Sequence, residues 1–167
     1  MRSEWGGRYR SMIQALVQHS NVISRYARIK GEIAPGVWLS AQEWQVLEYL
    51  IEHEDETENM LYVSERLGIA QSSLSKYTKT LCSEKLVERY RIKGNKKSII
   101  LKATQRGFEV YDYRSSHVNL ELFAPLFKEL ESVPDEMIEQ VAGAITALNL
   151  SMWRGQREEL IPMDTDE

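Results

Sequence analysis

The residues of this sequence that could do chemistry together are polar and basic side chains on one face of a predicted helix. In residues 71–83, helical spacing directs Leu74, Tyr77 and Leu81 toward the protein interior. The opposite face then carries Gln71, Ser72, Ser73, Ser75, Lys76 and Lys79. Short polar side chains let a helix approach base edges and lysines neutralise phosphates, so this face is typical of a DNA-binding helix. The alternative is that Ser72 or Ser73 only caps the start of the helix.

A predicted two-stranded hairpin follows this helix and carries further basic side chains. From Leu86 the apolar spacing changes to two, which places Leu86, Tyr90 and Ile92 on one face of a strand. Gly94 and Asn95 form a turn signal, and residues 98–102 predict the returning strand. The other face and the turn contribute a second set of candidate DNA contacts: Arg89, Arg91, Lys93, Asn95, Lys96 and Lys97.

Charge is unevenly distributed along the chain. The 167 residues carry a net charge of −4, which by itself argues against a nucleic-acid partner. Residues 64–106, however, contain eleven basic and three acidic residues, a net charge of +8, and the remainder has a net charge of −12. A small basic module within an acidic body is the pattern expected of a protein that binds a polyanion through one surface.

Helices on both sides must position this module. Apolar spacing predicts a first helix over residues 9–29, ended by Gly31 and a loop at Pro35 and Gly36. Ser40 and Glu43 form a capping box for a second helix with a broad apolar stripe over residues 44–51. An acidic run over residues 52–58 is interpreted as an exposed helix end and loop.

The order of elements predicts a winged helix-turn-helix. Residues 61–84 predict two short helices around Gly68, which can adopt the positive φ that the turn needs, with the small Ser64 where the helices touch. A helix from residue 105 into the 120s follows, which Pro125 is expected to kink or stop. Pro134 then marks the start of the last helix.

The sequence resembles the MarR family of bacterial transcription regulators over roughly residues 12–150. The resemblance rests on the order of helices and on the stretches VSERLGI (63–69), LCSEKLVER (81–89) and LKATQRG (101–107). In that family a Leu-Thr-x-x-Gly-like step leads from the wing into a long dimerisation helix, and Thr104 to Gly107 match it. Two positions depart from the pattern: the wing tip lacks the acid-x-Arg arrangement, and Lys85 stands where the family often has glycine.

The resemblance implies a mainly α fold with a small β-hairpin wing, classed as α+β. It implies an N-terminal dimerisation helix (1–36), a winged helix-turn-helix lobe (37–104), C-terminal dimerisation helices (105–155) and an acidic tail (156–167). The expected function is a homodimeric, sequence-specific regulator, expected to repress, that binds double-stranded DNA at a pseudo-palindromic operator. A small-molecule effector is expected to bind between the dimer helices and the winged lobe, where Tyr26, Trp38, Trp44 and Tyr113 could line a pocket or serve only as core and interface residues.

Other functions have less support. The polar, basic outer face of the 71–83 helix favours DNA over a winged helix used only for protein contacts, while a non-specific architectural DNA binder stays a further alternative. Cys82 could be a redox sensor through its basic neighbours, but a small core residue is the commoner role of a free cysteine.

We expect no enzyme, no cofactor and no metal. The sequence has no phosphate-binding loop or nucleophile motif, and His117 with Glu121 is a weak metal pair. It also has no signal-peptide core, and its longest weakly polar stretch, residues 141–153, is too short to span a bilayer. The expected location is therefore the cytoplasm.

Overall fold

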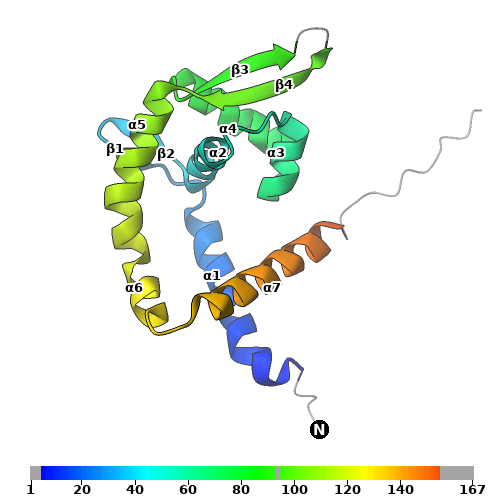
Figure 1. Ribbon diagram of the computed structural model, residues 1–167, viewed down its shortest axis with the longest axis vertical. Coiled ribbons are helices and arrows are strands. Elements are labelled where there is room, and N and C mark those ends of the chain that lie inside the picture. The colour runs from blue at the N-terminus through cyan, green and yellow to red at the C-terminus, as the bar shows by residue number, and fades with distance from the viewer. Residues whose placement is uncertain (1–4, 93–94, 155–167) are drawn as a thin grey trace, which may run out of the picture. The chain divides into compact units, whose positions relative to one another are not determined.

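The structure is a computed structural model that describes residues 5–92 and 95–154. The chain divides into two compact units, Met1–Glu121 and Leu122–Glu167. The first contains the N-terminal helix, two β-hairpins and the helix-turn-helix, and the second contains most of α6 and all of α7 (Figure 1). Helices with two small antiparallel sheets confirm the predicted mainly α, α+β class.

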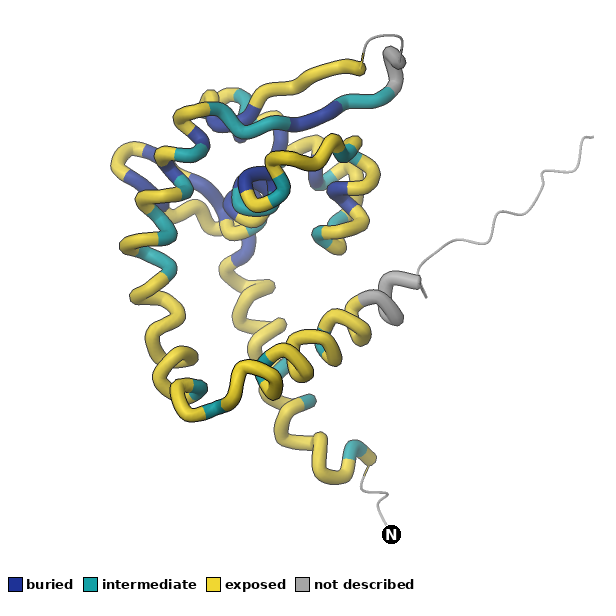
Figure 2. The backbone as a smooth tube through the Cα atoms, in the orientation of Figure 1, coloured by how far each residue is buried: buried dark blue, intermediate teal, exposed yellow. Residues whose placement is uncertain are grey.

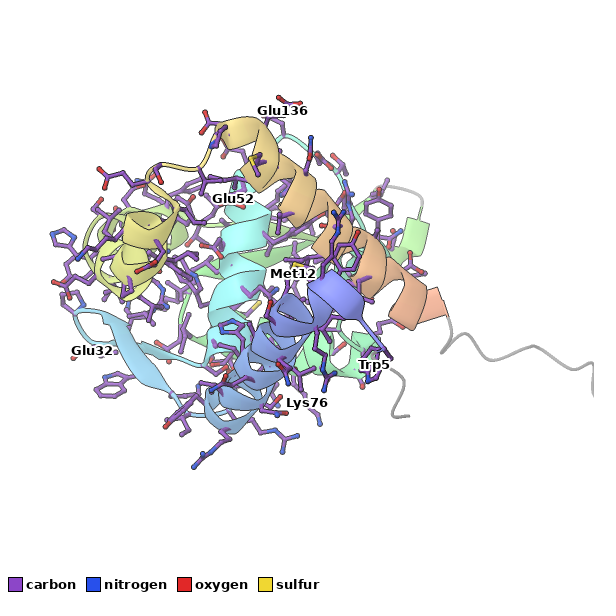
Figure 3. The ribbon with its side chains drawn as sticks, turned by 90° about the horizontal axis from the view of Figure 1, so that it is seen from below. Trp5, Met12, Glu32, Glu52, Lys76 and Glu136 are labelled. Atoms are coloured by element: carbon purple, nitrogen blue, oxygen red, sulfur yellow. The ribbon has the colours of Figure 1, made fainter. Side chains whose placement is uncertain are left out.

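The N-terminal helix α1 (Arg10–Tyr26) follows a short 3-10 turn, Gly7–Tyr9, and buries none of its side chains. Most of its large apolar residues are exposed (Figure 2), including Val17 at 56% and Tyr26 at 58%, while Ile13 and Leu16 are half-buried. Farther toward the N-terminus, the labelled Trp5 and Met12 are also exposed (Figure 3). Most helical stability in proteins comes from packing an apolar face, and within one chain α1 leaves much of its apolar face unpacked.

A β-hairpin stands where the sequence predicts only a loop. Strands β1 (Gly31–Ala34) and β2 (Val37–Leu39) pair antiparallel around Pro35 and Gly36. Gly36 has φ +73°, and its amide donates to the Glu32 carboxylate at 2.8 Å. The prediction was wrong because strands of four and three residues are too short to show a recognisable alternation.

Helix α2 (Ala41–Glu52) is the centre of the core. The predicted capping box is present: the Ser40 amide donates to the Glu43 carboxylate at 2.8 Å, and the Glu43 amide donates to Ser40 Oγ at 3.3 Å. The predicted stripe is buried as well: Trp44, Val46, Leu47, Leu50 and Ile51.

The helix-turn-helix is confirmed as α3 (Met60–Leu67) and α4 (Gln71–Ser83), which pack on each other and, through α4, on α2. Gly68 ends α3 with φ +64°, as the turn requires. Ser64 is 2% exposed, and its hydroxyl donates to the Leu61 carbonyl at 2.7 Å, so a small polar residue occupies the contact without an unpaired group.

The wing consists of β3 (Val87–Ile92) and β4 (Asn95–Ala103), paired antiparallel. The predicted apolar face of β3 was wrong: Tyr90 and Ile92 are 50% and 45% exposed, whereas Val87 is buried. Leu86 is buried in the turn before the strand, where Lys85 has φ +59°, and every residue of β3 after Val87 is exposed, so the strand has no alternating buried face. Gly94 of the predicted turn lies outside the described residues.

Helix α5 (Gln105–Arg114) continues through a π-helical turn, Ser115–Asn119, into α6 (Leu120–Leu130), and α7 (Asp135–Arg154) follows. Pro125 does not stop the helix, which runs five residues beyond it, contrary to one of the two predicted effects. The last helix begins directly after Pro134, as predicted. Among the described helices, none combines the length and the apolar character that crossing a membrane would require.

The first turn of α5 sits directly on the turn that joins α4 to β3. Thr104 caps α5 by accepting the Gly107 amide at 3.1 Å, and its own hydroxyl donates to the Lys85 carbonyl at 2.7 Å. The Thr104 amide donates to the Leu86 carbonyl at 3.0 Å. A Cβ atom on Gly107 would lie 2.4 Å from that carbonyl oxygen, so only glycine allows this approach.

We therefore expect Gly107→Ala to lower the free energy of unfolding by about 1–3 kcal/mol, the usual range for an overpacked site. Gly31→Ala is the matched control, since a Cβ atom there meets nothing within 4 Å. Chemical denaturation of both variants measures the effect. Equal stability of the two variants would contradict the tight contact at Leu86.

Candidate nucleic-acid interface

The outer face of α4 is set by the residues that bury its inner face. Leu74, Thr78 and Leu81 are each 0% exposed, and Tyr77, which the sequence also placed inward, is half-buried against the core. The Thr78 hydroxyl donates to the Leu74 carbonyl at 2.7 Å, which lets a polar residue occupy this inner position. The predicted outward residues Gln71, Ser72, Ser75, Lys76 and Lys79 are exposed, and Ser73 is half-buried.

The start of α4 carries no side-chain cap. Its N-cap residue is Ala70, whose carbonyl accepts the Ser73 and Leu74 amides at 2.9 and 3.0 Å. Ser72 and Ser73 therefore lie within the first turn and do not have the capping role that was their alternative interpretation. Amides in the first turn of a helix point along its axis and attract anions.

Two clefts flank the outer face of α4. One, of about 330 Å³, lies between α4 and β3. Its lining residues are Lys79, Cys82, Val87, Glu88 and Arg89, so Lys79 and Arg89 border the same cleft. The other, of about 430 Å³, lies toward α3 and β4 and is lined by Asn59, Met60, Leu61, Gln71, Ser75, Ser98 and Ile99. The outer face of α4 thus forms a polar ridge between these two clefts. The helix itself lies next to the β3–β4 hairpin (Figure 1).

The wing supplies Arg89 and Arg91, both exposed on β3. They stand opposite Leu101 and Ile99 of β4 and so share the face of the sheet that Val87 anchors in the core. Of the other predicted wing contacts, Lys93 lies outside the described residues. Asn95, Lys96 and Lys97 belong to β4, but their side chains are outside the described part of the chain.

Two members of the basic module have other partners, and a third lines a separate cavity. The Lys102 ammonium donates to the backbone carbonyls of Glu54 and Glu56, the second at 2.8 Å, and so holds the acidic loop to β4. The Arg66 guanidinium lies 5.5 Å from the centre of the Tyr62 ring, and Arg106 lines a separate cavity with the β1–β2 hairpin. Sequence reasoning missed the role of Lys102 because its partners are more than 45 residues away along the chain.

The acidic loop that Lys102 holds is also fixed at Tyr49. The Tyr49 hydroxyl donates to the Glu58 carboxylate at 2.6 Å, and its ring stacks on His53 with centroids 4.1 Å apart. Burial and the Glu58 carboxylate raise the pKa of Tyr49 to about 12. The predicted helix end and loop is therefore exposed, and its backbone and side chains are held in place by Lys102 and Tyr49.

Cys82 and His117 have ordinary structural surroundings. Cys82 is half-buried and packs against the hydrophobic core, which is the role that the sequence favours. His117 stacks on Tyr113 at 4.6 Å, and its Nδ1 lies 2.9 Å from the Tyr113 carbonyl. Within the described residues no three His, Cys, Asp or Glu side chains form a group that could hold a metal ion.

A second cluster of ionisable side chains lies between α2 and the end of α5. Trp44 stacks on Tyr111 at 5.8 Å, and the Arg114 guanidinium lies 4.7 Å from the Trp44 ring centre. Burial lowers the pKa of Arg114, against the opposing effect of Glu48. Its Nε is buried and has no hydrogen-bond partner among the residues that the structure describes. Burial and the nearby Glu52 raise the pKa of Glu48.

Comparison with known proteins supports the fold. Neither a known family profile nor a curated protein sequence matches this chain. Among solved structures, the transcriptional regulator BldR from Sulfolobus solfataricus matches with a TM-score of 0.65 and 18% identity, covering 87% of this chain and 99% of that one. A mutant MarR from E. coli in complex with operator DNA matches with a TM-score of 0.62 and 16% identity, covering 86% and 99%.

A MarR-family transcriptional regulator from Rhodococcus sp. RHA1 matches with a TM-score of 0.61 and 18% identity, covering 84% of this chain and 93% of that one. Together with the geometry above, these likenesses define the chain as a winged helix-turn-helix protein. Its fold is the one found in regulators of the MarR family, as the sequence stretches around the turn and the wing predicted.

On duplex DNA we expect Lys79→Ala to reduce the slope of log affinity against log salt by about 0.9, the value for one lost phosphate contact. Lys102→Ala is the matched control, because the Lys102 ammonium is bonded to loop carbonyls. That variant should lose stability and keep the slope. Filter binding over a salt series measures both, and equal slopes for wild type and Lys79→Ala would remove Lys79 from the interface.

Proposed function

We propose that this protein is a sequence-specific regulator of transcription that binds double-stranded DNA. The observation that carries the proposal is the outer face of α4, where an amide, hydroxyls and lysines are exposed together while Leu74, Thr78 and Leu81 on the inner face are fully buried. A helix of this kind fits the major groove, where Gln71 can bond to adenine and the serines permit close approach. Lys76, Lys79 and the arginines of β3 would then neutralise phosphates on either side.

The wing is proposed to contact the DNA backbone more than the bases. Arg89 and Arg91 are exposed on the strand, and the tip that follows contains lysines in place of an acid-x-Arg arrangement. Lysine is a weaker reader of a narrow minor groove than arginine, because its ammonium is strongly hydrated and lacks a planar fork of donors. The wing therefore adds affinity and the helix adds sequence preference.

We infer that the protein acts as a homodimer. A single chain leaves large apolar side chains exposed along α1 and again in the second unit, a pattern that soluble monomers avoid. The exposed residues that a second copy would cover are Met12, Val17, Val22, Ile23 and Tyr26 in α1 and Leu122, Phe123, Leu126, Phe127, Met137, Val141 and Leu148 in the second unit. Two copies present two α4 helices, which suit a pseudo-palindromic operator.

Repression is the regulatory outcome that this assembly supports. A dimer that occupies two successive major grooves excludes other proteins from the same stretch of DNA, so binding over a promoter blocks transcription. We propose that the protein acts in the cytoplasm.

The test is a selection of genome fragments by the purified protein at low and moderate salt. We expect an enriched pseudo-palindrome whose half-sites lie roughly 34 Å apart on one face of the duplex, bound by a dimer in sedimentation. Salt-sensitive retention without an enriched sequence would instead make this an architectural DNA binder. No retention at either salt by folded protein would favour a winged helix that binds a protein partner.

We further propose that an anionic small molecule releases the protein from its operator. The support is Arg114, a half-buried guanidinium stacked on Trp44 whose Nε lacks a partner among the described residues. Carboxylate and phosphate groups are the natural partners of arginine, and Trp44 and Tyr111 offer aromatic surface beside it. The neighbouring π-helical turn at Ser115–Asn119 is a feature often found at functional sites.

Arg114→Met should keep operator affinity and lose release by anionic compounds, because the variant retains the apolar stem and lacks the charge. Arg106→Met is the matched control on the same helix and should respond as the wild type does. The measurement is fluorescence anisotropy of labelled operator titrated with a panel of aromatic and aliphatic carboxylates and phosphates. Release of the Arg114 variant by the compound that releases the wild type would refute this assignment.

A further inference from the structure

The larger of the two clefts beside α4 is lined without any charged side chain. It has a volume of about 430 Å³ and lies between the start of α3, the first half of α4 and strand β4, so we call it the α3–α4–β4 cleft. Its lining residues are Asn59, Met60, Leu61, Gln71, Ser75, Ser98 and Ile99. Four of them belong to the basic module of residues 64–106. Phosphates are bound best by cations, so this uncharged cleft within a basic module suits a neutral group.

Three of the lining side chains are apolar. Leu61 is 52% exposed, whereas Met60 and Ile99 are half-buried and pack against the hydrophobic core. An apolar side chain that is left in water gains free energy when another apolar group covers it. The cleft therefore favours a ligand that brings an apolar group to Leu61.

The start of α3 is fixed in place by hydrogen bonds. The Asn59 side chain accepts the Tyr62 amide at 3.0 Å and caps the helix, and Asn59 also forms a β-bridge with Ile100 of β4. One turn farther along, the Ser64 hydroxyl donates to the Leu61 carbonyl at 2.7 Å. Leu61 is therefore held beside β4 before any ligand arrives, and a surface that is fixed in advance loses little conformational entropy on binding.

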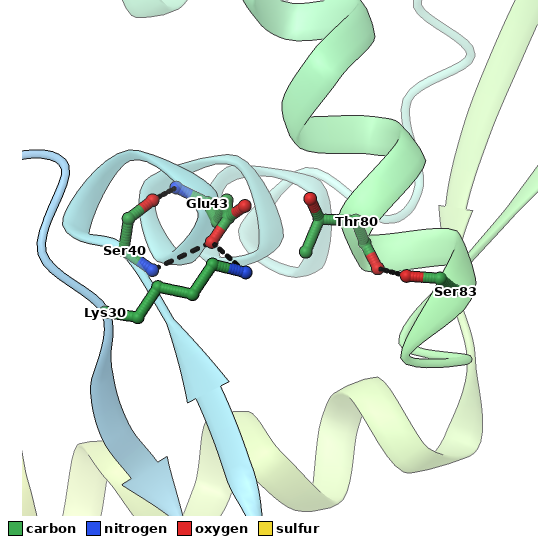
Figure 4. A network of polar contacts seen from close by, with 5 residues as sticks. All are labelled: Lys30, Ser40, Glu43, Thr80 and Ser83. Atoms are coloured by element: carbon green, nitrogen blue, oxygen red, sulfur yellow. Dashed lines mark hydrogen bonds and ion pairs between the residues drawn. The ribbon is translucent and has the colours of Figure 1, made fainter.

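The polar side of the cleft belongs to the N-terminal half of α4. Gln71 and Ser75 lie one turn apart on this helix, and both are exposed on its outer face as well as lining the cleft. Near the other end of α4, the Ser83 hydroxyl donates to the Thr80 carbonyl at 2.7 Å and so bonds within the helix itself (Figure 4). Gln71 and Ser75 are therefore the polar groups of α4 that meet the apolar side chains of α3.

This combination matches one feature of the major groove of DNA. Among the four bases only thymine presents an apolar group there, its C5 methyl, and glutamine is a common partner of adenine. Cytosine has a hydrogen at the position of that methyl group and presents an amino group beside it. An amide next to exposed apolar side chains therefore favours A·T pairs over G·C pairs.

We propose that the α3–α4–β4 cleft determines sequence specificity by receiving the methyl group of a thymine, with Leu61 as its main contact. This inference rests on the proposed function, in which α4 lies in the major groove. It adds α3 and β4 to a base-reading surface that otherwise consists of α4 alone. Lys76 and Lys79 on the outer face of α4 are left to neutralise phosphates.

Replacing thymine by deoxyuridine tests the proposal, because this change removes the methyl group and nothing else. In the operator from the fragment selection, each thymine is replaced in turn, at the equivalent position of both half-sites. Fluorescence anisotropy of the labelled duplex measures the affinity of the full-length protein. We expect at least one position where each lost methyl group weakens binding about fourfold, the value for burying one such group. At that position, 5-methylcytosine should bind more tightly than cytosine by the same factor.

Three variants connect this effect to the cleft. Leu61→Ala removes the main apolar contact and should bind the thymine and deoxyuridine operators equally. Leu61→Met keeps an apolar side chain of similar size and should retain the difference. Leu120→Ala is the matched control, because Leu120 is a leucine of α6 with 56% exposure outside the cleft, and this variant should also retain the difference.

Two results would overturn the inference and leave the proposed function intact. One is a selected operator on which no deoxyuridine replacement changes the affinity of the wild type, or whose half-sites contain no thymine. The other is a deoxyuridine effect that persists in full in Leu61→Ala, which would place the methyl group elsewhere on the protein. Failure to select any operator would instead overturn the proposed function itself.

Discussion

The burial of one side of α4 is the constraint on which the rest of the structure depends. Leu74, Thr78 and Leu81 are completely inaccessible, and truncating a leucine in such a position costs about 2–5 kcal/mol. This packing determines the rotation of the helix about its own axis, and the rotation alone decides that Gln71, the serines and the lysines face outward. The chemistry of the candidate interface is therefore a consequence of how the core is packed.

The first turn of α5 is tied to the end of this helix by directional bonds. At its C-terminal end, Thr104 and Gly107 place the first turn of α5 against the carbonyls of Lys85 and Leu86. Apolar contacts supply most of the stability, and these few polar contacts specify one arrangement among several that would bury similar area. The same helix that presents the polar ridge is thus connected through its C-terminal turn to the start of α5.

For binding a polyanion, the location of the charged residues matters more than the net charge of the chain. The chain is acidic overall, yet its basic residues concentrate around α4 and the wing. The structure divides even these residues: Lys102 and Arg66 hold neighbouring elements, while Lys76, Lys79, Arg89 and Arg91 remain at the surface that flanks the polar ridge. A surface of this composition within an acidic body favours a polyanion at one place and repels it elsewhere.

The sequence by itself determined the elements whose signals are local. The capping box at Ser40 and Glu43, the positive φ at Gly68 and the inward leucines of α4 depend on residues a few positions apart, so their patterns predicted the helices and the outer face correctly. Only the tertiary structure decided the β1–β2 hairpin, the exposure of β3 beyond Val87, the continuation of α6 past Pro125 and the partners of Lys102 and Arg114. Most of these depend on which elements meet in space, and the contacts of Lys102 and Arg114 join residues far apart in the chain, which no local spacing can encode.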